Sequence, residues 1–243
     1  MQKIQKLTIG IRPATKIFRL PSLVGLIIDS ILDERGSHTL EKEYFTNVHT
    51  NYEQSFFVMR NAELGNYLNM GENNISLTKD VYETDKIFNL KKFIQEFSVI
   101  WDIVNGYLKL HDIRRIGMVA EHRFLIEKTN PNKVLIEAIT SFESPKFPAK
   151  FLFRYEERRP TIESIAPDIK KDDFINIIYD YYDSERDADH PAPGALNCNL
   201  DVQRYYSPLV SSNVLDETKK LEKIFLNEKK VFDAFLIERG IAS

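Results

Sequence analysis

Residues 7–31, LTIGIRPATKIFRLPSLVGLIIDSI, and residues 114–142, RRIGMVAEHRFLIEKTNPNKVLIEAITSF, show the same order of features. Each begins as a strand that contains Ile-Gly, continues through a turn marked by proline and ends in a short apolar helix. Each is followed by further alternating runs and then by a long amphipathic helix. The order strand, helix, strands, helix therefore occurs twice, which predicts an internal duplication.

The first long helix is predicted from apolar residues at three- and four-residue spacing. It is expected to begin near Asp85 or Lys86 and to end within residues 106–110. Phe97 and Trp101 lie on its apolar stripe, so we expect both side chains to be buried.

The second long helix is predicted over residues 213–239 by the same spacing. Asn213 is expected to cap its start, and Gly240 is expected to end it. Its apolar side is predicted to consist of Leu221, Ile224, Phe225, Val231, Phe232, Phe235 and Leu236.

Runs with two-residue alternation, separated by turn residues, predict antiparallel strands that have one buried and one wet face. In the first half they lie at about 43–50, 54–60, 65–70 and 74–82, and in the second half at about 147–158, 173–183 and 196–206. The polar stretches ERRPTIESIAPD and SERDADHPAPGA between the later strands are predicted to be loops.

These patterns predict an α+β protein in which an antiparallel sheet has long helices on one face. Residues 1–110 are expected to form an N-terminal α+β half and residues 111–243 a C-terminal α+β half, and the two are expected to pack as one compact unit. Edge-to-edge pairing of two pseudo-equivalent halves would remove exposed strand edges and leave a continuous saddle.

Composition narrows the functional classes. The formal net charge of −3 over 243 residues is not the strong positive charge typical of nucleic-acid-binding proteins. No apolar run is long enough to span a membrane, so no membrane is expected as a partner. The N-terminus lacks a secretory signal, and the lone Cys198 excludes an internal disulfide framework, so a cytoplasmic protein is expected. No glycine-rich phosphate loop, His-Glu-x-x-His or paired-cysteine motif is present. We therefore expect no cofactor, and the absence of such motifs favours a noncatalytic protein while leaving enzymatic activity open.

Arginines are the main candidates for binding a ligand or partner, because the guanidinium fork matches phosphates and carboxylates. The mixed composition of both faces of the strand that follows His111 favours a position at the edge of the sheet. The candidate residues are Arg114, Arg115, Arg123, Arg154, Arg158 and Arg159.

An acidic stretch after Asp180 contains enough carboxylates and an imidazole to suggest a divalent-metal site. The spacing lacks the glycine and the distal glutamate of a calcium-binding loop, which favours a mobile acidic loop without a metal. The candidate ligands are Asp183, Asp187, Asp189 and His190.

The strand at residues 114–123 resembles that of a sporadically distributed family of uncharacterised bacterial proteins, which carry an Arg-x-Gly-Leu-Arg-Tyr-x-Asn-like strand after a long central helix. Arg115 and Gly117 are shared with that strand. The similarity covers the C-terminal half, because the family also ends with a strand like residues 196–202 and a long helix that closes with an aromatic pair. The resemblance implies the fold and suggests an accessory role in bacterial conflict or defence.

Three functions follow as hypotheses. The first is a noncatalytic binding or interaction module, for which a protein is the favoured partner. The second is a sequence-nonspecific nucleic-acid-binding protein that uses the six arginines. The third is a metal-dependent hydrolase that uses Asp180 together with the acidic stretch after it.

Overall fold

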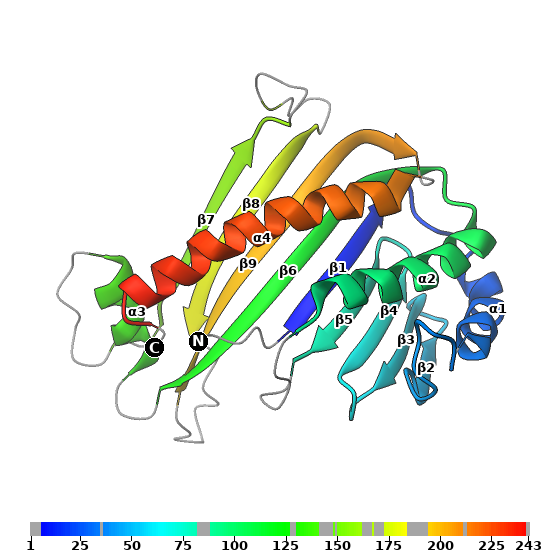
Figure 1. Ribbon diagram of the computed structural model, residues 1–243, viewed down its shortest axis with the longest axis horizontal. Helices are drawn as coiled ribbons and strands as arrows, with labels where there is room; N and C mark the ends of the chain where they lie inside the picture. Colours follow the sequence, from blue (N-terminus) through cyan, green and yellow to red (C-terminus); the bar gives the residue numbers. More distant parts are fainter. Residues whose placement is uncertain are drawn as a thin grey trace.

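The computed structural model describes residues 6–34, 36–81, 88–126, 130–140, 148, 150–161, 167, 173–183, 194–210 and 213–241. Within these residues the chain forms one antiparallel sheet and four helices (Figure 1). The strands are β1 (Lys6–Pro13), β2 (Asn47–Asn51), β3 (Phe56–Asn61), β4 (Asn66–Gly71), β5 (Ile75–Asp80), β6 (Asp112–Ile126), β7 (Leu152–Arg159), β8 (Phe174–Asp183) and β9 (Gly194–Val210). The helices are α1 (Leu20–Asp33), α2 (Leu90–Leu108), α3 (Pro131–Ile139) and α4 (Val214–Glu238).

The α+β class and the antiparallel sheet are confirmed. The strand order is β2-β3-β4-β5-β1-β6-β9-β8-β7. In each half, the first strand of the half lies at the middle of the sheet and pairs with the last strand of that half. The remaining strands follow towards the edge in reverse order of sequence. The N-terminal half has one strand more than the C-terminal half. The two halves therefore share a layout, whereas their origin by duplication and the division into halves at residues 110 and 111 stay predictions.

The two Ile-Gly strands meet at the centre of the sheet. β1 pairs with β6 so that Gly10 lies opposite Gly117, Ile9 opposite Met118 and Ile11 opposite Ile116. Exchanging the two strands leaves this register unchanged, so Gly10 and Gly117 mark a local two-fold axis.

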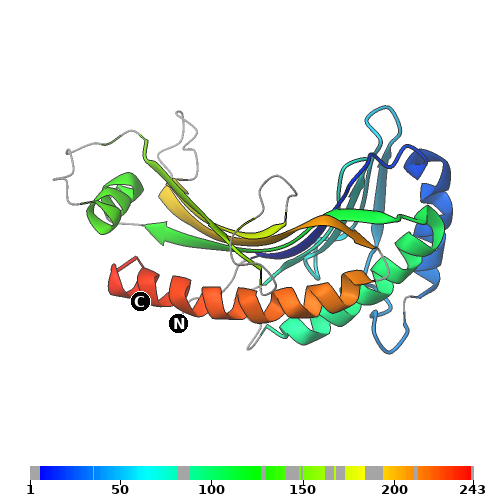
Figure 2. The same ribbon diagram turned by 90° about the horizontal axis from the view of Figure 1, so that it is seen from above.

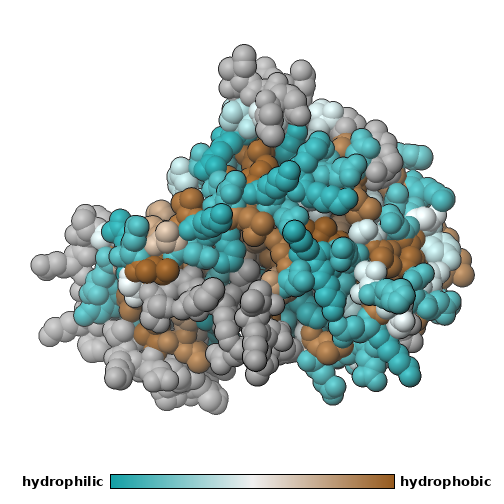
Figure 3. Space-filling view, in the orientation of Figure 1, coloured by the Kyte–Doolittle hydropathy of each residue, from teal (hydrophilic) through white to brown (hydrophobic). Residues whose placement is uncertain are grey.

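The sheet has one covered and one open face (Figure 2). α2 and α4 lie along the convex face, which we call the helical face, and the sheet curves away from them at both ends. No described helix lies over the concave face, which we call the open face. Seen from the side of α2 and α4, the surface of the molecule carries mostly hydrophilic side chains, with scattered apolar ones (Figure 3). The expected saddle with both long helices on one side is thus confirmed.

The predicted burial of the apolar side of α2 is confirmed, because Phe97 is 1 % exposed and Trp101 is 2 % exposed. The predicted start of this helix was wrong: residues 88 and 89 are not helical, and α2 begins at Leu90. The physical reason is the cap, since the Asn89 side chain accepts a hydrogen bond from the backbone N–H of Lys92 at 3.0 Å.

The bounds of α4 agree with the sequence prediction, and Gly240 follows it with a positive φ of 67°. Two details differ. Asn213 occupies the N-cap position without a side-chain cap bond, and Val231 is exposed. Val231 lies beside the buried face rather than on it, because that face is formed by Val214, Thr218, Leu221, Phe225, Glu228, Phe232 and Leu236.

β6 lies at the centre of the sheet rather than at its edge, which corrects the expectation from its mixed composition. It pairs with β1 on one side and β9 on the other. Ile116, Met118 and Ala120 are buried on the helical face, so the alternating positions Arg115 and Gly117 lie on the open face. The charged residues that suggested an edge belong to the open face of a central strand.

The core is one cluster of buried apolar side chains that draws on both halves of the chain. It fills the space between the helical face of the sheet and the helices. No helix in the described part of the chain is long and apolar enough to cross a membrane.

Candidate functional site

The open face can be traced from the strand register, because residues directly opposite one another point to the same side of a sheet. One residue from each of the nine strands forms a continuous row across this face. We call it the central row, and it consists of His49, Val58, Asn69, Ser76, Gly10, Gly117, Gln203, Asn176 and Arg158.

A pocket of about 300 Å³ opens at the β7 end of this row. Its floor is a stacked pair of rings, Phe174 and Tyr205, whose centroids are 4.7 Å apart with an interplanar angle of 17°. The Arg115 guanidinium lies 5.7 Å from the centroid of the Tyr205 ring, and the Arg158 guanidinium lies 5.1 Å from that of Phe174. Two cations therefore flank one aromatic pair, an arrangement in which each ring face attracts a guanidinium. We call it the arginine–aromatic pocket, and its lining residues are Arg115, Arg154, Glu156, Arg158, Phe174, Asn176, Ile178, Gln203 and Tyr205.

Hydrogen bonds hold the Arg115 side of the pocket. Arg115 Nη1 donates to the Tyr205 hydroxyl at 3.2 Å and to Gln203 Oε1 at 3.4 Å. The Tyr205 hydroxyl donates to the same Gln203 oxygen at 3.0 Å. These partners are neutral, so they position the guanidinium without balancing its charge.

The pocket is lined by three arginines, Arg115, Arg154 and Arg158, and by one carboxylate, Glu156, so its lining carries a net positive charge. Neither Arg115 nor Arg158 forms an ion pair with a described carboxylate. Arg154, which also lines the pocket, contrasts with them, since its Nη2 is 2.7 Å from Glu156 Oε1 and its Nη1 is 3.8 Å from Asp180 Oδ2. In addition, Arg12 lies directly opposite Arg115 on β1. Like charges directly opposite each other destabilise a sheet, so this end of the open face favours an anion.

Next to Gln203, on the same open face of β9, lies the carboxyl group of Asp201 in an unfavourable environment. Burial raises the pKa of Asp201 to about 6, although the hydrogen bond from Gln203 and the nearby Arg115 and Arg154 guanidiniums lower it. Asp201 Oδ1 has no hydrogen-bond partner among the described residues. Because this pKa lies below neutral pH, the carboxyl is mostly ionised at pH 7 and offsets part of the charge of the neighbouring arginines.

The six predicted arginines separate into three groups. Arg115, Arg154 and Arg158 come together in the pocket. Arg159 alternates to the helical face, where its guanidinium is 2.6 Å from Glu157 and 2.6 Å from Glu228 of α4. The remaining two lie elsewhere on β6: Arg114 is at the bulge after Ile113, and Arg123 is on the open face near the other end of the strand. Their predicted roles in binding stay predictions.

Sequence reasoning missed several of the pocket residues, among them Phe174, Asn176 and Gln203. Each occupies an alternating strand position, and each becomes informative only when β8 and β9 are paired in register. Tyr205 lies directly opposite Phe174 on the neighbouring strand, and the two rings stack.

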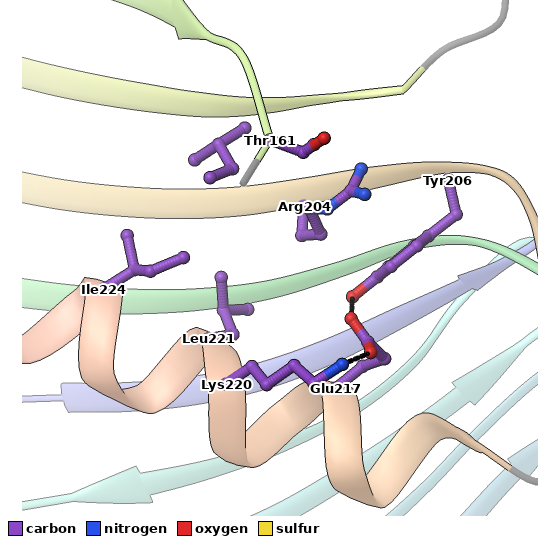
Figure 4. A pocket seen from close by; sticks show the side chains of 8 residues that line it. Thr161, Arg204, Tyr206, Glu217, Lys220, Leu221 and Ile224 are labelled. Carbon is purple, nitrogen blue, oxygen red and sulfur yellow. Dashed lines mark hydrogen bonds and ion pairs between the residues drawn. The ribbon is translucent and has the colours of Figure 1, made fainter. Parts of the chain in front are cut away.

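A second pocket, of about 50 Å³, lies between the first turns of α4 and the sheet (Figure 4). The Arg204 guanidinium is 4.4 Å from the centroid of the Tyr206 ring, and its Nη1 is 2.6 Å from Asp173 Oδ1. The Tyr206 hydroxyl donates to Glu217 at 3.0 Å, and Lys220 donates to the same carboxylate at 2.6 Å. Because these charges are paired with one another, the cluster anchors α4 to β9 rather than presenting a free charge.

The predicted metal site falls mostly outside the described residues, where Asp187, Asp189 and His190 lie. Asp180 and Asp183 are described, and they face opposite sides of β8, since Asp180 pairs with Asn199 on the open face and Asp183 is three residues further on. Asp183 accepts a hydrogen bond from the Asn132 side chain at 3.0 Å. Among the described residues, no group of three or more His, Cys, Asp or Glu side chains is placed to hold a metal ion.

Comparison with known proteins points to distant structural likeness and to no family. No family model matches the chain, and no curated protein matches it. A solved structure titled Methanococcus jannaschii TBP is 12 % identical and is matched over 96 % of this chain and 97 % of that chain, with a TM-score of 0.27. A likeness at this level carries no argument about the site.

Proposed function

We propose that this chain is a noncatalytic binding module whose partner occupies the open face of the sheet. The observation that carries the proposal is the arginine–aromatic pocket, in which two guanidiniums are held against rings and lack a described carboxylate partner. Cations that are positioned but unbalanced favour an anionic group from outside the molecule.

The distribution of reactive side chains supports a binding role over a nucleophilic one. Cys198, the sole cysteine, is fully buried on the helical face, and burial raises the pKa of its thiol to about 12. His122 is 1 % exposed on the same face and packs against Phe124 and Phe232. Both side chains are packed in the core on the helical face, so neither contacts a ligand on the open face.

The favoured partner is a protein, and an acidic surface on that protein would pair with Arg115 and Arg158. The resemblance to the bacterial family adds an accessory role in conflict or defence to this proposal.

Affinity purification tests the proposal when the wild-type chain is compared with a surface variant. Arg115→Gln combined with Arg158→Gln removes the two unbalanced charges from the open face. Lys219→Gln combined with Lys223→Gln removes two charges from exposed positions on α4 and is the matched control. We expect the partner, identified by mass spectrometry, to be lost with the arginine variant and kept with the control. Equal recovery with both variants would mean that the open face is not the binding surface.

A further inference from the structure

We infer that the outer edge of β7 binds a second copy of this chain, which pairs its own β7 antiparallel to the first in a register centred on Tyr155. The pairing continues the sheet across a two-fold axis and keeps the open faces of both copies on the same side. It goes beyond the proposed function, because a second copy at the edge of the sheet is a separate partner from a protein on the open face.

The first step is that the edge is accessible. β7 is the end strand of the sheet and pairs with β8 on one side (Figure 1). Within the part of the chain that the structure describes, no backbone hydrogen bond joins the other side of β7 to a further segment. β2 at the opposite edge has five residues and β7 has eight, and a short edge strand is one way in which proteins prevent pairing with another chain. β7 is therefore the less protected edge.

The second step is the apolar surface along this edge. Leu152, Phe153 and Tyr155 are all exposed, Tyr155 to 50 %. The Tyr155 ring stacks on Tyr179 at 6.2 Å between centroids, and Tyr179 stacks on Phe232 of α4 at 5.9 Å. A row of rings on the helical face thus runs outward and ends at an exposed ring. A second Tyr155 directly opposite the first extends this row and covers that ring.

The third step is the choice of register. A two-fold axis perpendicular to a sheet places residues of the same face opposite one another, so the axis passes beside a single residue of β7. Only two centres pair seven of the eight residues of β7. One centre is Tyr155, which pairs residues 152–158, and the other is Glu156, which pairs residues 153–159.

The charges of β7 decide between these centres. With Tyr155 at the centre, Arg154 of each copy lies opposite Glu156 of the other copy. Within one chain, Arg154 Nη2 is already 2.7 Å from Glu156 Oε1, so the four charges alternate in sign around a square. With Glu156 at the centre, the two Glu156 side chains face each other, and Arg154 faces Arg158. Like charges directly opposite each other destabilise a sheet, which favours the register centred on Tyr155.

The same charges favour a second copy over an unrelated strand. Backbone hydrogen bonds alone would accept any extended segment. The charges of β7 require a cation and an anion on either side of a central residue, in the reverse order along an antiparallel strand. β7 of a second copy meets this requirement, and two-fold dimers are the commonest oligomers of soluble proteins.

Sedimentation velocity over a series of protein concentrations tests the inference. The wild type should pass from the mass of one chain to that of two as the concentration rises. Arg154→Glu alone, or Glu156→Arg alone, places like charges opposite each other twice in the symmetric pair, so each should weaken self-association by about 10-fold or more. Lys223→Glu, a charge reversal at an exposed position on α4, is the matched control and should leave self-association unchanged.

Mixing the two single variants is the decisive measurement. A chain with Arg154→Glu carries two anions beside Tyr155, and a chain with Glu156→Arg carries two cations there, so opposite charges meet only in a mixed pair. The equimolar mixture should therefore regain the association that each variant alone has lost. Recovery in the mixture also shows that both variants are folded.

Amide hydrogen exchange on the wild type needs no substitution. Backbone N–H groups on the outer edge of β7 should exchange more slowly at high than at low protein concentration, because pairing protects them. Those on the outer edge of β2 should exchange at the same rate at both concentrations.

A wild type that keeps the mass of one chain at every concentration would overturn the inference and leave the β7 edge to a strand of another protein. Equal self-association of the wild type and all three variants would overturn it as well, because the copies would then meet at another surface. If the two single variants stay apart when mixed, the register centred on Tyr155 is wrong. None of these outcomes bears on the open face, which the affinity purification with Arg115 and Arg158 variants tests separately.

Discussion

His122 and Asp201 are two ionisable side chains whose environments oppose their charged forms, one on each face of the sheet. Burial and the nearby Lys229 ammonium lower the pKa of His122 to about 4, against the raising effects of Asp233 and the Cys198 carbonyl. Burial raises the pKa of Asp201 to about 6. Both groups therefore titrate differently in the folded and unfolded chain, and each links stability to pH.

His122 should make the protein less stable in acid. Its pKa is lower in the folded chain than the ordinary 6.5, so between about pH 6.5 and 4 the unfolded chain takes up a proton that the folded chain does not. The contribution of His122 to the free energy of unfolding should therefore fall as the pH falls through this window. Urea denaturation at several pH values should show a flatter acid limb for His122→Gln than for the wild type. An identical acid limb in both proteins would contradict this prediction.

Asp201 should have the opposite effect. Its pKa is higher in the folded chain than the ordinary 3.8, so its contribution to stability falls as the pH rises from about 4 to about 6 and then stays low. Asp201→Asn keeps the shape and removes the charge, and it should raise the free energy of unfolding at neutral pH by about 2 kcal/mol. Its urea midpoint should exceed that of the wild type at pH 7 and match it near pH 4. A lower midpoint at pH 7 would show that the carboxylate stabilises the folded state.

α4 is held to the sheet by one narrow face. Phe232 lies on that face, 5.9 Å from the Tyr179 and Tyr181 rings and 5.4 Å from the His122 ring, measured between centroids. Glu228, one turn earlier, accepts hydrogen bonds from the Tyr179 hydroxyl at 2.9 Å and from Arg159. The helix thus combines apolar packing with a partly buried ion pair at neighbouring turns.

Two adjacent residues of α4 should differ sharply on truncation. Phe232 is 1 % exposed, so Phe232→Ala should lower the free energy of unfolding by about 3–5 kcal/mol through lost burial and a cavity. Val231 is 61 % exposed, so Val231→Ala should change it by about 0.5 kcal/mol or less. Equilibrium urea denaturation measures both values. Similar losses for the two variants would mean that the helix is rotated relative to the sheet.

The whole molecule is organised around the β1–β6 seam. Hydrogen bonding is continuous across all nine strands, and the core cluster includes residues from both halves. A sheet that crosses the seam without interruption couples the stability of one half to that of the other.

We therefore expect the two halves to unfold together. Trp101 is the sole tryptophan and lies on α2 in the N-terminal half, so its fluorescence reports on that half, whereas far-ultraviolet circular dichroism reports on the whole chain. The two urea transitions should coincide, as expected for one cooperative unit. A fluorescence transition that precedes the circular dichroism transition would show that residues 1–110 unfold as a separate domain.

Local pattern alone was sufficient to predict the elements. The α2 stripe around Phe97 and the alternation through Ile116 and Met118 follow from the helical and strand periods, which depend on residues only a few positions apart. The layout with both long helices on one face also followed, because each half repeats the same order of elements. The exact bounds escaped, as at β7, which was predicted over 147–158 and is observed over Leu152–Arg159, and at Asn89, where one side-chain hydrogen bond sets the start of the helix.

The candidate site required the tertiary structure, because its members lie far apart in the chain. Arg115 meets Tyr205 across 90 positions, and Arg158 meets Phe174 only because β7 and β8 pair in one register. The sequence identified six arginines but could not separate Arg158 on the open face from Arg159 on the helical face. A shift of one residue in register exchanges the two faces of a strand, and the register is determined by the packing of the whole sheet against α2 and α4.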